Sequence, residues 1–581
     1  MEPIEISEIL ENYKNGSSSA SKPYNVLISN LSDPNVKSVF IVKVLRGLSD
    51  FVTNLDKKFE HLIGTVLKLD WPNREPRVVI EYQTFILNLI SANTFYLKSC
   101  LKSFITRFRP SDDTDVNDVI DEQRNKDGLI FLNIHAILRS IVKIVPMAPK
   151  ILMPLLIDYY PYITRSGYHH ECYLKNLLLM PQYLTNDRRQ ILALIVGKLL
   201  ELDTRSPRQA ILDAIDDETE DDDNEDEEMN VDEIFVMDES LSAEKAEVQE
   251  KSTDQLSHSE ANKLDILMEI LLQYIHNTCF VSGQLNWEET KKLYKELLGV
   301  FEDVILPTHS SSHVQYLLFY ICSFKQPLAD GFIDYLWKKV KNPNTQPIYR
   351  QAAVAYMCGL ISRGLFVPIS TAVVTMEHMS QWIHSYIQQS SYSVVVDVTR
   401  HRTFYSVCQA LFYIFIFRHK EILQSQKGYK FSLNLNLQAI VTCRLNPLKI
   451  CLPVIVKTFS SVTRQHQIAF CDTIIEHNNR AFIPVTTLDR SHSYSQLCHT
   501  NSLDSFFPFD PYILPRSKHA IEPLYREYSG NPIEDDDNDS TGEDEDEFLK
   551  EQLPDHSVEV SMAKSPTQLL LYGSSPGFKH T

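Results

Sequence analysis

The feature that most constrains the fold of this 581-residue chain is its shortage of glycine. Only 16 residues are glycine, about 3% where roughly 7% is usual. Nucleotide-binding α/β folds, barrels and hairpin-rich β proteins need glycine in tight turns and phosphate-binding loops. This chain is better suited to helices that are joined by short turns and bounded by proline.

Apolar residues recur at helical spacing through most of the chain. One stripe consists of Leu192, Ile195, Leu199 and Leu202, and a second of Leu264, Leu267, Leu271 and Tyr274. Spacings of three and four place each set on one face of a helix. Proline or polar breaks separate such segments, which predicts an all-α fold, a HEAT-like α-solenoid of stacked helical hairpins. Because no clean sequence period is present, a compact irregular helical domain is the alternative.

The negative charge is concentrated in two short segments. Asp216–Glu233 holds 13 acidic residues and Glu534–Glu547 holds 10, and neither contains Lys or Arg. Without these 23 residues the chain has 53 acidic and 56 basic side chains, so the remainder is nearly neutral. Both regions are too poor in aliphatic and aromatic residues to offset their chain entropy, so we expect a disordered acidic insert and a disordered acidic C-terminal tail.

These shifts in composition divide the chain into six parts. We expect an N-terminal segment at 1–23, N-terminal HEAT-like helices at 24–212, a disordered acidic loop at 213–260, C-terminal HEAT-like helices at 261–485, a capping strap at 486–530 and a disordered acidic tail at 531–581.

The strap is the least regular of these parts. Between Ser505 and Tyr528 four prolines alternate with aromatic and aliphatic residues. Proline at that density excludes a regular helix or a central strand. We expect the strap to lie across the last helices and cap the apolar end of the solenoid, either as a cap alone or while holding Arg516 and Lys518 available to a partner.

The cysteines and the length of the apolar runs indicate a protein of a reducing compartment that does not span a membrane. The ten cysteines contain no CxxC pair and lie mostly in apolar helical runs, as expected of a cytosolic or nuclear protein. The start of the chain does not resemble a signal peptide. The longest apolar run, Phe404–Phe417, has 14 residues, whereas a membrane span needs about 20. We therefore expect a soluble protein.

The apolar run should belong to a helix at the centre of the array, because it is apolar on every side. It ends in Arg418, His419 and Lys420. Cations near a helix C-terminus are favoured by the helix dipole, and the alternative is that Arg418 and Lys420 contact an acidic partner or nucleic acid.

The sequence carries no recognisable catalytic motif. It lacks a P-loop, a dinucleotide-binding glycine fingerprint, a GxSxG elbow and an HExxH pair. His309 and His313 are four apart, and His169 and His170 precede Cys172. Neither group has a spaced partner pair, so capping or packing is favoured over metal binding. We expect no enzyme activity, cofactor or metal.

Several hydroxyl residues lie in kinase-type contexts. Thr219 and Ser540 have an acidic residue three positions later, whereas Ser206, Ser565 and Ser575 precede proline. A phosphate adds nearly two negative charges and would change docking to a charged partner. The alternative is that the acidic regions are only solubilising tethers.

Five blocks then resemble one known family. They are 305–325, 349–357, 404–420, 445–453 and 506–525, and segment 173–203 extends the match into the first half. They are similar to the RNA polymerase I-specific transcription initiation factor family (TIF-IA). The resemblance implies a HEAT-repeat fold and a factor that binds RNA polymerase I near its stalk. It also implies bridging to promoter-bound core initiation factors at ribosomal RNA genes, and control by protein kinases.

The resemblance further implies a serine-bearing docking surface on the N-terminal helices. Ser91, Ser99 and Ser103 are the matching candidates, with ordinary helix-surface serines as the alternative. The family's other candidate area corresponds here to 145–150, which has no serine. The resemblance implies a location in the nucleus and nucleolus and leaves direct DNA contact open. The rival interpretations are another HEAT-type nuclear scaffold, such as a transport receptor, or an enzyme.

Overall fold

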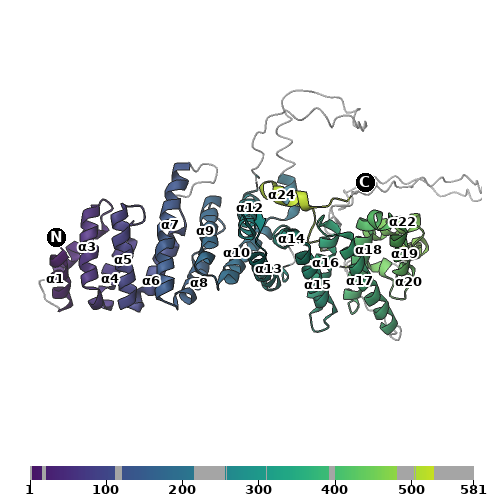
Figure 1. The fold of residues 1–581 in the computed structure, drawn as a ribbon, viewed down its shortest axis with the longest axis horizontal. Helices are drawn as coiled ribbons and strands as arrows, with labels where there is room; N and C mark the ends of the chain where they lie inside the picture. The colour runs from purple at the N-terminus through teal and green to yellow at the C-terminus, as the bar shows by residue number, and fades with distance from the viewer. Residues whose placement is uncertain are drawn as a thin grey trace, which may run out of the picture. The chain divides into compact units, whose positions relative to one another are not determined.

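The computed structural model of the chain describes residues 3–15, 21–110, 121–214, 256, 258–308, 311–390, 399–480, 503 and 506–528. It contains two compact units. The first comprises Met1–Ser310 and Ile513–His519, and the second comprises Ser311–Tyr512 and Ala520–Thr581. Among the described residues nearly all regular structure is helical, so the predicted all-α class is confirmed (Figure 1).

The first unit begins with eight helices in two rows. They are α1 Pro3–Lys14, α2 Ser21–Ser32, α3 Ser38–Asp50, α4 Glu60–Lys68, α5 Pro76–Ala92, α6 Leu97–Ile105, α7 Asp121–Ile144 and α8 Ala148–Asp158. The odd-numbered helices pack on one another in order, and so do the even-numbered helices. This alternation is the stacked-hairpin arrangement predicted from the sequence, in which each hairpin contacts mainly its neighbours.

The rest of the first unit continues the helical packing. It contains α9 Gly167–Leu179, α10 Arg188–Asp203, α12 Ser259–Cys279, α13 Trp287–Val300, a β-hairpin of β1 Phe280–Val281 and β2 Gln284–Leu285, the π-helix η6 Phe301–Ile305 and the 3₁₀ turns η1 Val52–Asn54, η2 Lys57–Phe59, η3 Thr94–Tyr96, η4 Thr106–Phe108 and η5 Met180–Gln182. Helix α12 packs on α9, α10 and α13. The helices before and after the acidic insert are therefore neighbours in one unit.

The second unit is centred on one long apolar helix. It contains α14 Tyr316–Ser323, α15 Gln326–Lys341, α16 Pro347–Arg363, α17 Ile369–Ser390, α18 Arg402–Leu423, α19 Gln426–Asn434, α20 Leu437–Val441, α21 Pro447–Ile450, α22 Pro453–Gln465, α23 Asp472–Arg480 and the 3₁₀ turn η7 Glu522–Leu524. Helix α18 packs on α16, α17, α19, α21 and α22. The prediction that the apolar run forms a central helix is confirmed.

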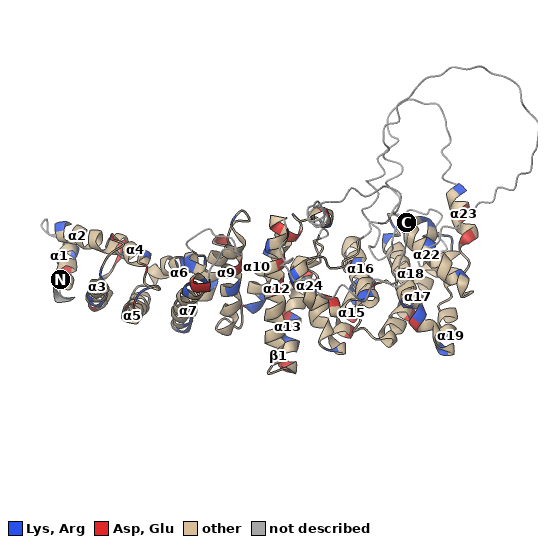
Figure 2. Ribbon diagram, turned by 90° about the horizontal axis from the view of Figure 1, so that it is seen from above, with Lys and Arg blue, Asp and Glu red and all other residues tan. Residues whose placement is uncertain are grey.

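Local sequence explains where many helices begin and which face they bury. Proline occupies the first turn of α5, α16 and α22, where its missing N–H would have no partner within the helix. All four members of the stripe in α10 are buried. Figure 2 shows basic and acidic residues interspersed along the helices. This agrees with the near-neutral composition outside the two acid runs.

The chain divides into its two units between Ser310 and Ser311, and the insert predicted at 213–260 falls within the range of the first unit. The reason is that α10 packs directly on α12, so the insert leaves and re-enters a continuous helical layer. Of the loop predicted as disordered at 213–260, residues 215–255 lie outside the described part of the chain, as does the acidic tail, whereas Ser259 and Glu260 already belong to α12.

Part of the strap packs within the second unit. The ring centroid of Phe509 is 5.3 Å from that of Tyr316 and 5.2 Å from that of Phe319, both on α14. Gly359 of α16 makes room for it, because a Cβ there would lie 3.0 Å from Phe509 Cδ2. Further along, Leu365 N donates to Leu524 O at 2.9 Å. The strap therefore packs on α14, on α16 and the turn that follows it, and through Phe507 and Tyr528 on α18, rather than on the last helices, where it was expected.

Another part of the strap, α24 Pro515–Ile521, is anchored within the first unit. The carboxylate of Asp265 on α12 accepts hydrogen bonds from the backbone N–H groups of Arg516 and Ser517, each at 2.8 Å. It also accepts one from Ser517 Oγ at 2.5 Å. The first turn of a helix has N–H groups without partners in the helix, and Asp265 satisfies two of them.

A candidate docking surface on the first unit

Helix α6 presents a short polar face that contains two of the predicted serines. Its apolar side is formed by the buried residues Leu97, Cys100, Leu101, Phe104 and Ile105. The opposite side exposes Lys98, Ser99 and Lys102, and leaves Ser103 half-buried. The helical period of 3.6 residues produces this division. Ser99 therefore lies between two lysines on one exposed face.

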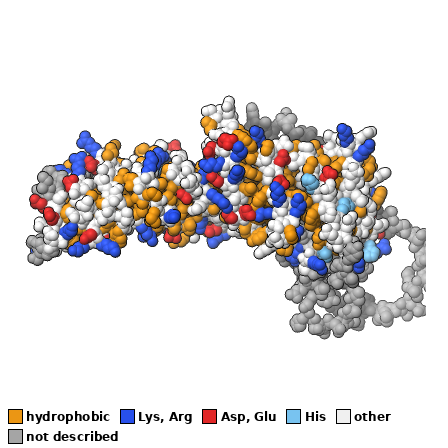
Figure 3. All heavy atoms as spheres, turned by 60° about the horizontal axis from the view of Figure 1, so that its bottom comes forward, with side chains coloured by type: hydrophobic (Ala, Val, Ile, Leu, Met, Phe, Trp, Pro, Cys, Tyr) orange, Lys and Arg blue, Asp and Glu red, His pale blue; other side chains and the backbone are white. Residues whose placement is uncertain are grey.

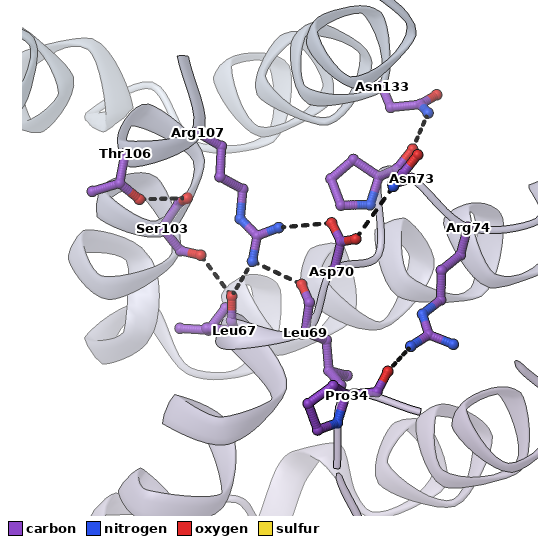
Figure 4. Close-up of polar contacts among 11 residues, drawn as sticks. Pro34, Leu67, Leu69, Asp70, Asn73, Arg74, Ser103, Thr106, Arg107 and Asn133 are labelled. Atoms are coloured by element: carbon purple, nitrogen blue, oxygen red, sulfur yellow. Dashed lines mark hydrogen bonds and ion pairs between the residues drawn. The ribbon is translucent and has the colours of Figure 1, made fainter. Parts of the chain in front are cut away.

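Ser103 does more than occupy the helix surface. Its hydroxyl donates a 2.7 Å hydrogen bond to the carbonyl oxygen of Leu67, near the C-terminal end of α4. Arg107 donates to the same carbonyl at 3.2 Å and to Leu69 O at 2.7 Å. The last carbonyl groups of a helix have no partner within the helix. Ser103 and Arg107 therefore cap α4 and tie it to α6 (Figure 4).

The same polar network continues toward α7. Arg107 lies 3.8 Å from the carboxylate of Asp70, whose other oxygen accepts from Asn73 at 3.5 Å. In the same loop, Pro72 O accepts a 3.0 Å hydrogen bond from the side chain of Asn133 on α7. Figure 4 shows these groups in one polar cluster at the junction of α4, α6 and α7. The loop after α4 is thus fixed from both sides.

Ser91 lies on a different helix. It is exposed at the end of α5, and its hydroxyl donates to Leu87 O, four residues earlier, at 2.7 Å. This is the usual local bond of a serine on a helix surface. The structure brings Ser99 and Ser103 onto one helix and leaves Ser91 on the preceding one.

Aromatic side chains flank the lysines of this region. Lys57 Nζ lies 4.9 Å from the ring centroid of Phe95, which is 49% exposed. Lys102 Nζ lies 5.5 Å from the ring centroid of Tyr159. These contacts fix cations over aromatic faces. We define the docking surface as Lys98, Ser99, Lys102 and Ser103.

Beside it, helices α5 and α7 form a groove that sequence analysis did not identify. Its cavity volume is about 530 Å³, and its lining residues are Pro72, Asn73, Arg74, Pro76, Val79, Ile80, Gln83, Lys126, Leu129, Ile130, Asn133 and Ala136. Ile80 and Leu129 are 61% and 64% exposed. Figure 3 shows hydrophobic side chains among charged ones on the face of the first unit that it draws.

The interior between α7 and α9 is polar but closed. The ring of His135 lies 2.9 Å from the hydroxyl of Tyr183 and 3.0 Å from the side-chain oxygen of Asn176. Burial lowers the pKa of His135 to about 4, although the bond to Asn176 opposes this. Burial likewise lowers the pKa of His170 to about 4. Both imidazoles are neutral packing groups at pH 7.

The histidines that could have suggested a metal are used in packing. His170 Nε2 lies 3.1 Å from Tyr162 O, and His169 Nδ1 lies 3.0 Å from Ser166 Oγ. His313 is buried, with Tyr512 edge-on at 5.3 Å, and His309 lies outside the described residues. In the described part of the chain, no group of three His, Cys, Asp or Glu side chains is placed to hold a metal.

The predicted partner-contact cations differ in their exposure. Arg418 is only 1% exposed, and its guanidinium donates to Ile361 O and Val367 O and pairs with Glu421. The prediction that Arg418 contacts a partner is therefore wrong in this fold, because the end of α18 is covered by the end of α16. Lys420 and Lys518 are exposed, and Arg516 is half-buried.

The phosphorylation candidates have mixed outcomes. Ser206 is completely buried, so its Ser-Pro motif is not open to a kinase in the folded protein. The other candidates, Thr219, Ser540, Ser565 and Ser575, lie outside the described residues. No helix in the described ranges combines the length and apolar character needed to cross a membrane.

Comparisons with known proteins cover nearly the whole chain. A family model described as RNA polymerase I specific transcription initiation factor RRN3 matches residues 4–533. The RNA polymerase I-specific transcription initiation factor RRN3 of Mus musculus is 37% identical over 586 residues, which cover 96% of this chain and 87% of the mouse protein. The Schizosaccharomyces pombe protein rrn3, named in the same way, is 25% identical and covers 86% of this chain and 82% of its own length.

A solved structure supports the fold. The crystal structure of RNA polymerase I transcription initiation factor Rrn3 aligns with a TM-score of 0.69 and 19% identity, over 91% of this chain and 99% of the other. At that identity the similarity supports the helical architecture alone.

Proposed function

The chain belongs to the RNA polymerase I-specific transcription initiation factor family, and from this premise we propose that it binds RNA polymerase I and bridges it to promoter-bound core initiation factors at ribosomal RNA genes. Family membership makes it a transcription initiation factor with a nuclear role, not an enzyme or a transport receptor. The finer parts of this proposal are the stalk region of the polymerase as the contact, the nucleolus as the location and HEAT-type repeats as the class of its hairpins.

The observation that carries the proposal is the exposed face of α6. Lys98 and Lys102 flank Ser99 on that face, so the unmodified surface carries two positive charges. It suits an acidic patch on the polymerase, because complementary charge steers association and fixes register. A phosphate on Ser99 would add nearly two negative charges and bring the face close to neutral. Phosphorylation would therefore weaken docking by removing the charge contrast.

Ser103 would respond to phosphorylation in a different way. Its hydroxyl is half-buried and caps the end of α4 through Leu67 O. A phosphate cannot donate that hydrogen bond and would have to leave the contact between α4 and α6. The expected effect is then a local loosening of the contact between α4 and α6, which weakens docking. Added salt should reduce this effect much less than it reduces an effect of surface charge.

The test compares aspartate and alanine at Ser99 in a quantitative pull-down of purified RNA polymerase I. We expect Ser99→Asp to weaken binding roughly three- to tenfold, as one or two exposed charge interactions would, and Ser99→Ala to bind as the unmodified chain does. The Ser99→Asp effect should shrink at 0.5 M salt, whereas a Ser103→Asp effect should persist.

Ser385 supplies a matched control. It is an exposed helix serine whose hydroxyl donates to Gln381 O, four residues earlier, at 2.9 Å, as Ser91 does to Leu87 O on α5. Ser385→Asp should leave binding unchanged, whereas Ser91→Asp weakens it if Ser91 shares the docking surface. Equal binding of Ser99→Asp and Ser99→Ala at low salt would remove α6 from the polymerase contact.

Bridging needs a second contact, and we propose that exposed cations elsewhere supply it. Lys420 and Lys518 are exposed and Arg516 is half-buried, and their charge suits acidic promoter-bound factors or DNA. Holding two partners at once raises the effective concentration of each near the other. Lys420→Glu and Lys518→Glu should therefore preserve the polymerase pull-down but reduce recovery of promoter-bound factors. Loss of both partners together would contradict separate contacts.

Regulation by protein kinases completes the proposal. Besides Ser99 and Ser103, we propose Thr219, Ser540, Ser565 and Ser575 as modified positions, because their acidic or proline contexts suit two kinase classes. Phosphopeptide mapping of the chain from growing and starved cells tests these positions. Absence of phosphate from all of them in both conditions would remove this part of the proposal.

A further inference from the structure

The groove between α5 and α7 has the properties of a binding site rather than of a packing defect. Its polar side chains are already used to hold it open. Gln83 donates to Asn133 O at 3.2 Å, Asn133 donates to Pro72 O at 3.0 Å, and Arg74 donates to Val36 O at 2.6 Å. The large apolar side chains that remain exposed in the lining are Ile80 and Leu129.

The charge of the groove is one-sided. Its lining contains two cations, Arg74 and Lys126, and no carboxylate. Lys126 is exposed next to Leu129 on α7. The acidic residues directly beside lining residues in sequence, Glu75, Glu81 and Asp127, are not in the lining, and Asp127 is buried and accepts from Tyr168. An occupant that fits must therefore combine several apolar side chains with negative charge.

The acidic insert contains such a segment. Residues 229–241, Met-Asn-Val-Asp-Glu-Ile-Phe-Val-Met-Asp-Glu-Ser-Leu, hold seven apolar residues and four carboxylates, with no Lys or Arg. They overlap the end of the acidic run Asp216–Glu233. The shorter segment 111–120 is also acidic, but it contains only three aliphatic residues and no aromatic one. Segment 229–241 is the better match in both apolar content and charge.

The insert is also long enough to reach the groove. Ala214 is the last described residue before it, and the 15 residue steps from there to Met229 span up to about 50 Å when extended. Helix α10 packs on α9, and α9 is bonded to α7 through Tyr168 and Asp127. Two steps between packed helices amount to roughly 20 Å. The tether is therefore long enough for Met229 to reach the groove.

We propose that segment 229–241 occupies the groove between α5 and α7 of the same molecule, with its apolar side chains on Ile80 and Leu129 and its carboxylates near Lys126. A tether of this length gives an effective concentration on the order of 1 mM. An intrinsic dissociation constant of about 0.1 mM then suffices for roughly 90% occupancy. The proposal does not depend on docking to the polymerase, because it concerns the isolated chain.

The test is photo-crosslinking in the purified full-length chain. The photoreactive amino acid p-benzoylphenylalanine replaces Ile80, and crosslinked peptides are identified by mass spectrometry. The matched control carries it at Val39 on α3, which is 68% exposed but outside the groove. We expect the probe at position 80, and not at 39, to crosslink to 229–241. A mixture of isotope-labelled and unlabelled chains separates crosslinks within one molecule from those between two.

Variants of the insert keep the test independent of folding. Ile234→Asp with Phe235→Asp should lower the crosslink yield at least about tenfold, because the transfer free energy of two apolar side chains is lost. Ala246→Asp with Val248→Asp adds the same charge outside the segment and should leave the yield unchanged. The proposal is overturned by crosslinks to 111–120 or to a second molecule, by equal yields at positions 39 and 80, or by no effect of the double variant at 234 and 235.

Discussion

The anchoring of α24 by Asp265 yields the sharpest prediction about stability. Asp265 is fully buried on α12, and its carboxylate accepts from Arg516 N, Ser517 N and Ser517 Oγ. Burial raises the pKa of Asp265 in spite of these three bonds, which oppose the shift. The burial of this charge is tolerated only because the first turn of α24 surrounds it with donors.

Replacing Asp265 by alanine leaves all three donors without an acceptor. A buried donor without a partner costs about 1–3 kcal/mol, and α24 can limit the loss by detaching and exposing its donors to water. We expect Asp265→Ala to weaken the docking of α24 by about 3 kcal/mol, which raises the population of the detached helix on the order of 100-fold. Ser517→Ala removes one hydroxyl and should cost only about 1 kcal/mol. Asp265→Asn keeps one oxygen and should fall between them.

Hydrogen exchange followed by mass spectrometry measures this directly on the amides of 516–521. The expected order of exchange rates is Asp265→Ala, then Asp265→Asn, then Ser517→Ala, then the unmodified chain. Asp330→Ala is the control, because that carboxylate accepts from Thr371 at 2.8 Å in the second unit. A Ser517→Ala effect as large as that of Asp265→Ala would refute the reasoning, since one hydroxyl would then account for the whole anchor.

Three further predictions concern a buried histidine, a close-packed glycine and a buried arginine. Because the pKa of His135 is lowered to about 4, the unfolded chain binds more protons below pH 6.5. The free energy of unfolding should therefore fall by about 2 kcal/mol between pH 7 and pH 5 on account of His135. In a His135→Asn variant the free energy of unfolding, measured by urea titration at each pH, should depend less steeply on pH. Gly428→Ala should lower the melting temperature by several degrees, because its Cβ would lie 1.7 Å from Ile422 O. Gly64→Ala, with nothing within 4 Å, should be neutral or slightly stabilising. Arg418→Met should cost roughly 2–4 kcal/mol in calorimetry, because it leaves two carbonyl groups without their donor and leaves Glu421 paired with Arg526 alone, whereas Lys420→Met should stay within about 0.5 kcal/mol.

Local patterns predicted the helices because each pattern is complete within one turn or two. The stripe in α10 and the all-round apolar run in α18 need no knowledge of their partners to be interpreted. The hairpin at Phe280–Leu285 was missed, although Ser282 and Gly283 have φ of 52° and 76° there. The Ser-Gly pair between Val281 and Gln284 was the available signal for such a turn.

Burial of individual polar residues was not predictable in the same way. Arg418 has the sequence context of an exposed cation at a helix end, and Ser206 has that of a kinase site, but both are buried. Their burial depends on residues far along the chain. Arg418 is covered by the turn that follows α16 and donates to Val367 O. No motif of a few residues encodes such a neighbour.

The candidate docking surface on α6 was predictable from the sequence only in part. The exposed face of α6 could be predicted from the helical period alone, since Lys98, Ser99 and Lys102 fall on the polar side. The role of Ser103 could not, because its partner Leu67 O belongs to another helix, 36 residues earlier.

The groove depends on non-local packing entirely. It exists because α5 and α7 are neighbours in the row of odd-numbered helices, although α6 separates them in sequence. In such a row each helix is held mainly by the helices two before and two after it. Surface residues on successive odd helices are therefore placed side by side without contributing much to folding. Ile80 and Leu129, each more than half exposed on neighbouring helices, sit in this arrangement, where substitution costs little stability and binding can account for their apolar character.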